Sequence, residues 1–133
     1  MGLSIEERNA LATYRMQRAK ETLDEAKAMI ESSFWRIAAN RLYYACYYAA
    51  TALLIKHEHD THTHSGAFSM LGLHFVSTGL ISMEHNKLYR RLMELRQMGD
   101  YSDWITVNQE DVTPLFKPAE KFIETIENII YSL

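Results

Sequence analysis

The residues best suited to chemistry interrupt the most apolar stretch of the chain. Asn40 and Arg41 lie within a run of alanine, leucine and tyrosine. A guanidinium among apolar side chains is costly unless it has a partner or faces a wet cleft. On a helix, Arg41, Tyr44, Ala45 and Tyr48 share one face, with Asn40 beside them. This face would bring a cation, an amide and two phenols together, a set suited to holding a phosphate and stacking on a base.

Arg41 also has a purely structural interpretation. Buried arginines are usually paired, and an ion pair between Arg41 and Asp100 or a glutamate would tie two helices together. The sequence leaves this alternative open beside ligand binding.

A second basic group precedes the segment Arg96-Gln97-Met98-Gly99-Asp100-Tyr101. Arg96 and Asp100 have the i, i+4 spacing of a helix-surface ion pair. Together with Arg96, the neighbouring cations could form a phosphate-binding edge or simply a solvated helix face. These neighbours are Lys87, Arg90 and Arg91. We therefore include Arg96 and Tyr101 with Asn40, Arg41, Tyr44 and Tyr48 as candidate ligand-binding residues.

The segment from His57 to His64 is rich in residue types that bind metals. His57, His59, His62 and His64 alternate there with acidic and polar residues. A metal site needs ligands held in a fixed geometry, which a flexible loop does not supply. We therefore expect a polar surface loop, with no metal and no cofactor.

Cys46 is the single cysteine of the chain. It can form no intrachain disulfide, and within an apolar helix a thiol normally acts as an inert space filler. This pattern fits a reducing cytoplasmic environment.

The first helix should begin near Ser4 and end near Glu31. Ser4 and Glu7 have the spacing of a capping box, in which each side chain bonds to the backbone of the other residue. Apolar residues that recur every three to five positions predict its buried stripe. These residues are Leu11, Tyr14, Ala19, Leu23, Ala26 and Ile30.

The second helix should span residues 34–56, with Ser33 as its N-cap. It is apolar on every face, so we expect it at the centre of the fold. Its alanines would allow other helices to approach closely.

Three further helical segments follow the loop. Ser65-Gly66 should open a third helix that runs to Gly79. Leu88, Leu92 and Leu95 mark a fourth, which closes near Gly99, and a linker at 102–108 precedes the last. The buried stripe of that last helix should consist of Phe122, Ile126, Ile129 and Leu133. Two prolines, Pro114 and Pro118, should bend or delay its start. The pattern predicts an all-α, antiparallel up-down helical bundle of four long helices plus a shorter one.

The bulk properties fit a single domain over residues 1–133. A net charge of −3 argues against broad electrostatic coating of nucleic acid, so any RNA contact must be local. The start of the chain is acidic and does not resemble a secretory signal. The longest apolar stretch is too short to span a bilayer. We expect a cytoplasmic protein with no membrane partner.

Several segments together resemble the HEPN domain family of bacteria and archaea. Residues 38–50, with Asn40-Arg41 and the tyrosines, resemble its signature helix. His64-Ser65-Gly66 is similar to the start of its third helix, and residues 74–79 are similar to the end of that helix. Arg96 to Tyr101 matches the Arg-x-x-x-Asp-Tyr close of its fourth helix. The resemblance implies a helical bundle that dimerises and is commonly encoded beside a minimal nucleotidyltransferase, its partner in a toxin–antitoxin pair.

Many members are ribonucleases, whose activity is attributed to an arginine followed four to six residues later by a histidine. No arginine of this chain is followed by histidine at that spacing, and Tyr48 stands where many relatives carry histidine. The ordinary pKa of a phenol is about 10, against about 6.5 for histidine. A phenol therefore exchanges protons poorly near neutral pH.

Three functions remain open on these residues. The first is a nucleotide- or RNA-binding module that pairs with a nucleotidyltransferase. The second is a diverged metal-independent ribonuclease, in which Arg41 or Arg96 stabilises charge and Asp100, Tyr48 or His64 moves protons. The third is a non-catalytic dimerisation or scaffold domain.

Overall fold

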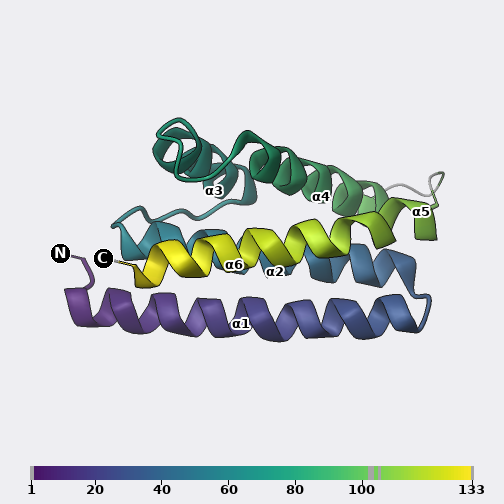
Figure 1. Cartoon of the computed structure of the whole chain (residues 1–133), viewed down its shortest axis with the longest axis horizontal. Coiled ribbons are helices and arrows are strands. Elements are labelled where there is room, and N and C mark those ends of the chain that lie inside the picture. Colours follow the sequence, from purple (N-terminus) through teal and green to yellow (C-terminus); the bar gives the residue numbers. More distant parts are fainter. Residues whose placement is uncertain (1, 102–103, 105, 133) are drawn as a thin grey trace.

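The computed structural model describes residues 2–101, 104 and 106–132, with Tyr101 described by its backbone alone. Within these ranges every regular element is helical. The elements are α1 (Ile5–Glu31), α2 (Trp35–Lys56), α3 (His64–Leu71), the π-helix η1 (Gly72–Val76), α4 (Met83–Tyr101), α5 (Gln109–Val112), the 3-10 turn η2 (Thr113–Leu115) and α6 (Phe116–Tyr131). Successive long helices run in opposite directions (Figure 1). This confirms the prediction of an all-α up-down bundle with four long helices and a shorter third one.

Helix α2 lies at the centre of the bundle. It packs against α1, α4 and α6, and all residues from Ala49 to Ile55 are buried. The alanines of α2 are at most 1% exposed, which lets the neighbouring helices approach closely. The prediction of a central helix is confirmed.

Helix α1 begins with the predicted capping box. The Glu7 amide donates to Ser4 Oγ at 3.1 Å, and the Ser4 amide donates to Glu7 Oε1 at 2.8 Å. The buried stripe differs in part from the prediction. Its members are Ala12, Met16, Ala19, Thr22 and Ala26. Tyr14 is 59% exposed because it lies two positions from both Ala12 and Met16, a spacing that points away from their shared face.

The role predicted for Ser33 is wrong. The residue before α2 is Phe34, and no side chain caps this end. Ser33 instead terminates α1, with a left-handed φ of 62°. The Phe34 amide donates to the Met29 carbonyl at 2.9 Å, the long closing bond of a Schellman motif. The tight turn between α1 and α2 therefore uses Ser33 for its backbone rather than for its hydroxyl.

The third helical segment is also more complex than predicted. Thr63 caps α3 by accepting from the Gly66 amide at 2.8 Å, so the helix begins at His64. The α-helix ends at Leu71 and continues as a π-helix, and the chain turns at Gly79 with a φ of 83°. The glycine stop is present, but the segment is not one continuous α-helix.

The C-terminal part follows the predicted stripes. Leu88, Leu92 and Leu95 of α4 are buried, although α4 extends to Tyr101 rather than stopping at Gly99. Phe122 and Ile126 of α6 are buried, Ile129 is half-buried, and Leu133 lies outside the described residues. Pro114 lies in η2 and Pro118 in the first turn of α6, which agrees with a delayed start. The short helix α5 was not predicted.

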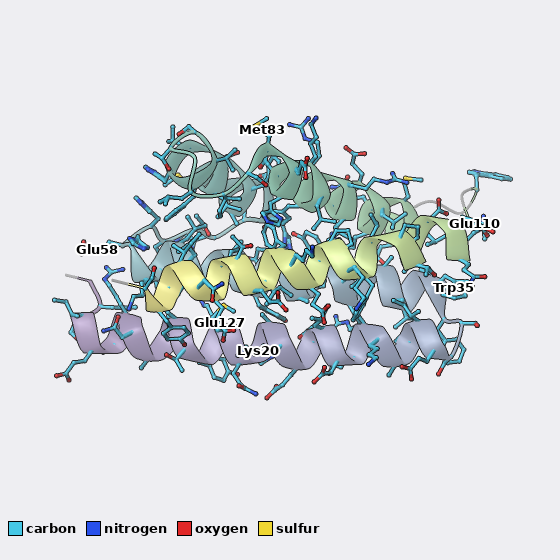
Figure 2. All side chains as sticks on the ribbon, viewed as in Figure 1. Lys20, Trp35, Glu58, Met83, Glu110 and Glu127 are labelled. Carbon is cyan, nitrogen blue, oxygen red and sulfur yellow. The ribbon has the colours of Figure 1, made fainter. Side chains whose placement is uncertain are left out.

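The first and last helices are joined by charge as well as by packing. Lys20 of α1 forms an ion pair with Glu127 of α6, and the two residues face each other across the gap between these helices (Figure 2).

Among the described helices, none is long and apolar enough to cross a membrane.

Ala49→Leu should lower the free energy of unfolding by about 1–3 kcal/mol, because the added methylenes must fit where α2 is enclosed by other helices. Urea denaturation monitored by circular dichroism would measure the change. Ala28→Leu, at an exposed position of α1, is the matched control and should stay within about 0.5 kcal/mol of wild type. Equal stability of the two variants would contradict the central position of α2.

Candidate functional site

Arg41 projects from α2 toward α1 and is held by two neighbours. Its Nη1 donates to Glu25 Oε1 at 3.3 Å. Its Nε and Nη2 donate to Asn40 Oδ1 at 3.1 and 2.7 Å. The side chain is 29% exposed, so it reaches solvent. The ion pair with a glutamate is one of the two pairings foreseen for Arg41, and the pair with Asp100 does not form.

Arg96 approaches the same place from α4. It is 9% exposed and donates from Nη1 to the Tyr44 hydroxyl at 3.2 Å. Its Nε lies 3.8 Å from Asp100 Oδ2, which confirms the i, i+4 ion pair. The Asn40 amide donates to the same Asp100 oxygen at 3.4 Å. A chain of polar contacts therefore runs from Arg41 through Asn40 and Asp100 to Arg96.

The ring of Tyr44 lies within cation–π distance of two guanidiniums. Its centroid is 5.3 Å from the guanidinium carbon of Arg41 and 5.6 Å from that of Arg96. Such contacts are favourable, and more so where water is partly excluded. We call Asn40, Arg41, Tyr44, Arg96 and Asp100 the Tyr44 cluster.

His64 adjoins the Tyr44 cluster, although the sequence did not place it among the ligand-binding residues. Its Nδ1 lies 2.6 Å from the Tyr43 hydroxyl, and its ring centroid lies 4.6 Å from that of Tyr47 and 5.7 Å from that of Tyr44. Burial, and to a smaller degree the positive charge of Arg96, lowers the pKa of His64 below its ordinary value. The imidazole is therefore neutral at pH 7 and can both accept and donate a proton.

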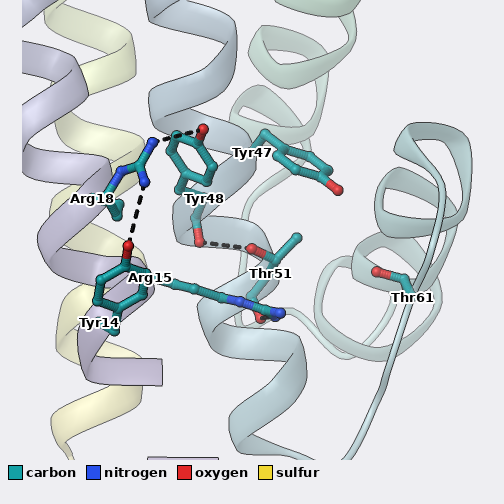
Figure 3. A pocket seen from close by; sticks show the side chains of 7 residues that line it. All are labelled: Tyr14, Arg15, Arg18, Tyr47, Tyr48, Thr51 and Thr61. Atoms are coloured by element: carbon teal, nitrogen blue, oxygen red, sulfur yellow. Dashed lines mark hydrogen bonds between the residues drawn. The ribbon is translucent and has the colours of Figure 1, made fainter. Parts of the chain in front are cut away.

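Tyr48 faces α1 rather than Arg41. Its hydroxyl accepts a hydrogen bond from Arg18 Nη2 at 3.2 Å, and Arg18 lies over its ring at 4.9 Å (Figure 3). The Tyr48 ring remains next to Tyr44, with centroids 6.0 Å apart. A pocket of about 200 Å³ opens beside Tyr48 between α1, α2 and the loop before α3. It is lined by Tyr14, Arg15, Arg18, Tyr47, Tyr48, Thr51 and Thr61.

Arg15 and Arg18 are further residues that sequence reasoning missed. Both lie on the polar side of an ordinary amphipathic pattern, and only the packing of α1 against α2 brings them to the tyrosines. The sequence offered no signal for them, because its apolar spacing placed Tyr14 in the buried stripe of the first helix.

The other cations of α4 do not join the Tyr44 cluster. Lys87 and Arg90 are exposed, and Arg90 lies over the ring of Phe68 at 5.6 Å. Arg91 is half-buried. The side chain of Tyr101, a candidate ligand-binding residue, lies outside the described residues.

The histidines of the segment from His57 to His64 make separate contacts and do not gather in one cluster. His64 belongs to α3, while His59 stacks on His74 with ring centroids 3.8 Å apart. No group of three or more His, Cys, Asp or Glu side chains that could hold a metal occurs in the described ranges. Cys46 is fully buried, which raises the pKa of its thiol.

Arg96→Met should raise the pKa of His64, because it removes the positive charge that disfavours the imidazolium while the rings around His64 remain. A pH titration followed by histidine NMR signals would measure the shift. The lowered pKa of His85 arises from burial and Lys121, so it should not change. As pH falls, the unfolded chain takes up a proton at His64 before the folded chain does, so the free energy of unfolding decreases on the acid side. An unchanged pKa of His64 in the variant would contradict the proximity of Arg96.

The chain is similar in sequence to proteins of one family. The sequence profile of the HEPN domain matches residues 12–129. A UPF0332 protein of Thermotoga maritima is 34% identical over 97% of this chain and 98% of its own length. Two proteins of Methanocaldococcus jannaschii, both named as candidate toxins, are 30% and 25% identical over 84% and 88% of this chain and 83% and 80% of their own lengths. The chain therefore belongs to the HEPN domain family, as its signature helix and its Arg-x-x-x-Asp-Tyr segment imply.

Proposed function

We propose that the chain is a HEPN-type module that binds a nucleotide or RNA at the Tyr44 cluster. The observation that carries this proposal is the Tyr44 ring flanked by the guanidiniums of Arg41 and Arg96. Guanidiniums bind phosphate oxygens in a bidentate manner, and aromatic rings stack on bases regardless of sequence.

Arg41 is the residue that contacts the phosphate in this proposal. Its partner Glu25 is 58% exposed, and ion pairs at such positions contribute only about 0–1 kcal/mol. A phosphate group can therefore displace the carboxylate at little cost. Arg96 is held by Tyr44 and Asp100 from within the bundle, so it supplies a fixed charge rather than a mobile contact.

The partial exposure of Arg41 favours binding over a purely structural role. The dimerisation or scaffold alternative calls for an Arg41 that is wholly buried and ion-paired. Arg41 has the ion pair but remains 29% exposed. The binding proposal accounts for both observations.

We further propose that the chain acts in a toxin–antitoxin-like pair. Two relatives are named as candidate toxins, and the family resemblance implies a minimal nucleotidyltransferase as partner. A single-domain homodimer in the cytoplasm, with no cofactor, completes this proposal. Copurification with the product of the adjacent open reading frame addresses the partner directly.

A diverged metal-independent ribonuclease is the second candidate, and the position of His64 favours it. The absence of histidine at position 48 removes one proton carrier, but His64 places a neutral imidazole beside the Tyr44 cluster. An imidazole that is neutral at pH 7 can act as a general base, with Arg96 stabilising the charge that develops on the phosphate.

Arg41→Ala should weaken binding of short RNA at the Tyr44 cluster by about tenfold or more, because it removes charge-assisted hydrogen bonds. Isothermal titration calorimetry would measure the affinities. Lys117→Ala, which removes an 82% exposed cation of α6, is the charge-matched control and should bind as wild type. Absence of RNA binding by the wild type, or equal affinity of wild type and Arg41→Ala for RNA, would refute the proposal.

The ribonuclease candidate predicts cleavage of RNA by the purified protein in the presence of a chelator. Arg96→Met should reduce the rate at least about 100-fold, since it removes a group that stabilises the transition state. His64→Gln should cause a similar loss and abolish the fall in rate that protonation of His64 causes on the acid side of neutrality. The products would be resolved by denaturing gel electrophoresis. Cleavage that persists in both variants, or no cleavage by the wild type, would exclude this candidate.

A further inference from the structure

The pocket beside Tyr48 has a chemistry of its own. Two cations of α1, Arg15 and Arg18, line it together with tyrosines of α1 and α2 (Figure 3). Neither cation forms a salt bridge with a carboxylate of the described residues. Two positive charges thus share one concave site in a chain whose net charge is −3.

Most hydrogen-bond donors of the two guanidiniums remain unused by the protein. Arg15 donates from Nη1 to the Thr51 carbonyl at 3.2 Å. Arg18 donates to the hydroxyls of Tyr14 at 3.4 Å and Tyr48 at 3.2 Å. A guanidinium carries five N–H donors, and these acceptors are uncharged. The remaining donors are available to a ligand.

Hydroxyl groups add further donors at the same place. Among the described residues, Tyr47 Oη and Thr61 Oγ1 form no hydrogen bond, and both residues line the pocket. Burial raises the pKa of Tyr47, so its hydroxyl stays protonated. The Tyr14 and Tyr48 hydroxyls already accept from Arg18, so each can still donate its proton. Figure 3 shows Arg15 extending across Thr51 toward the side where Thr61 lies.

We propose that this pocket is a second anion site, which binds the phosphate group of a small phosphomonoester with a planar base. Donors that converge from α1, α2 and the loop at Thr61 match the three terminal oxygens of a phosphomonoester better than the two of a carboxylate. The volume of about 200 Å³ suits a phosphate with part of its attached group. The exposed ring of Tyr14 provides a surface for the base. The pocket shares no residue with the Tyr44 cluster, so its occupancy does not depend on Arg41.

NMR of arginine Nε–Hε groups would test the site with defined probes: inorganic phosphate, uridine 5′-monophosphate and uridine. Inorganic phosphate and uridine monophosphate should shift the signals of Arg15 and Arg18, the monophosphate with the higher affinity, and uridine should not. Arg15→Met and Arg18→Met should each weaken binding of the monophosphate at this site roughly tenfold. Lys27→Met, which removes an exposed cation from the opposite side of α1, should leave it unchanged.

A measurement on the wild-type protein keeps the test independent of the folding of variants. Uridine monophosphate should protect Arg15 and Arg18 from phenylglyoxal, as read by mass spectrometry, and should not protect the exposed Arg90. Protection of Arg41 without Arg15 and Arg18 would overturn this inference while sparing the proposed function. Binding at Arg15 and Arg18 that persists in Arg41→Ala would support it even if the Tyr44 cluster bound nothing.

Discussion

Helix α2 is enclosed by other helices along most of its length, so several of the polar side chains that it carries bond to neighbouring elements. Arg41 reaches Glu25 of α1, and Asn40 reaches Asp100 of α4. Tyr43 reaches His64 of α3, and Tyr48 reaches Arg18 of α1. Because unpaired buried polar groups are costly, these contacts add to the apolar packing that holds α1, α3 and α4 around α2. The candidate site thus arises where polar side chains of the central helix contact residues of neighbouring elements.

Much of the fold could be predicted from local patterns. The continuous apolar character of α2, the leucine spacing of α4 and the Ser4–Glu7 capping box each specify structure within a few residues. The predictions that were wrong concern positions where backbone geometry, and not the type of side chain, determines the local structure. Ser33 has a residue type that caps helices, yet its left-handed backbone closes α1 instead. The π-helix at Gly72–Val76 was missed because Ser65-Gly66 and Gly79 mark only the ends of the segment and do not distinguish i→i+5 from i→i+4 hydrogen bonds.

The proximity of the candidate residues could be predicted only within a single helix. Asn40, Arg41 and Tyr44 share a face of α2, so helical spacing placed them together. Distant positions that meet through packing leave no such trace. Arg18 contacts Tyr48 across 30 positions of the chain, and Arg96 contacts Tyr44 across 52. The relation between Arg96 and Asp100 was visible because it lies within one helical turn.

The two guanidiniums and the imidazole near Tyr44 lie on elements that differ in how extensively they pack against the bundle. Both guanidiniums belong to long helices that pack along the bundle, whereas His64 opens an eight-residue helix that packs mainly on α2 and η1. Short segments with few packing neighbours open locally at lower free energy than the bundle as a whole. Opening of α3 would carry the imidazole away from Arg96 while leaving both positive charges in place. In the proposed function, capture of an anion by the guanidiniums and transfer of a proton by His64 would therefore be separable events, and local opening of α3 would affect only the second.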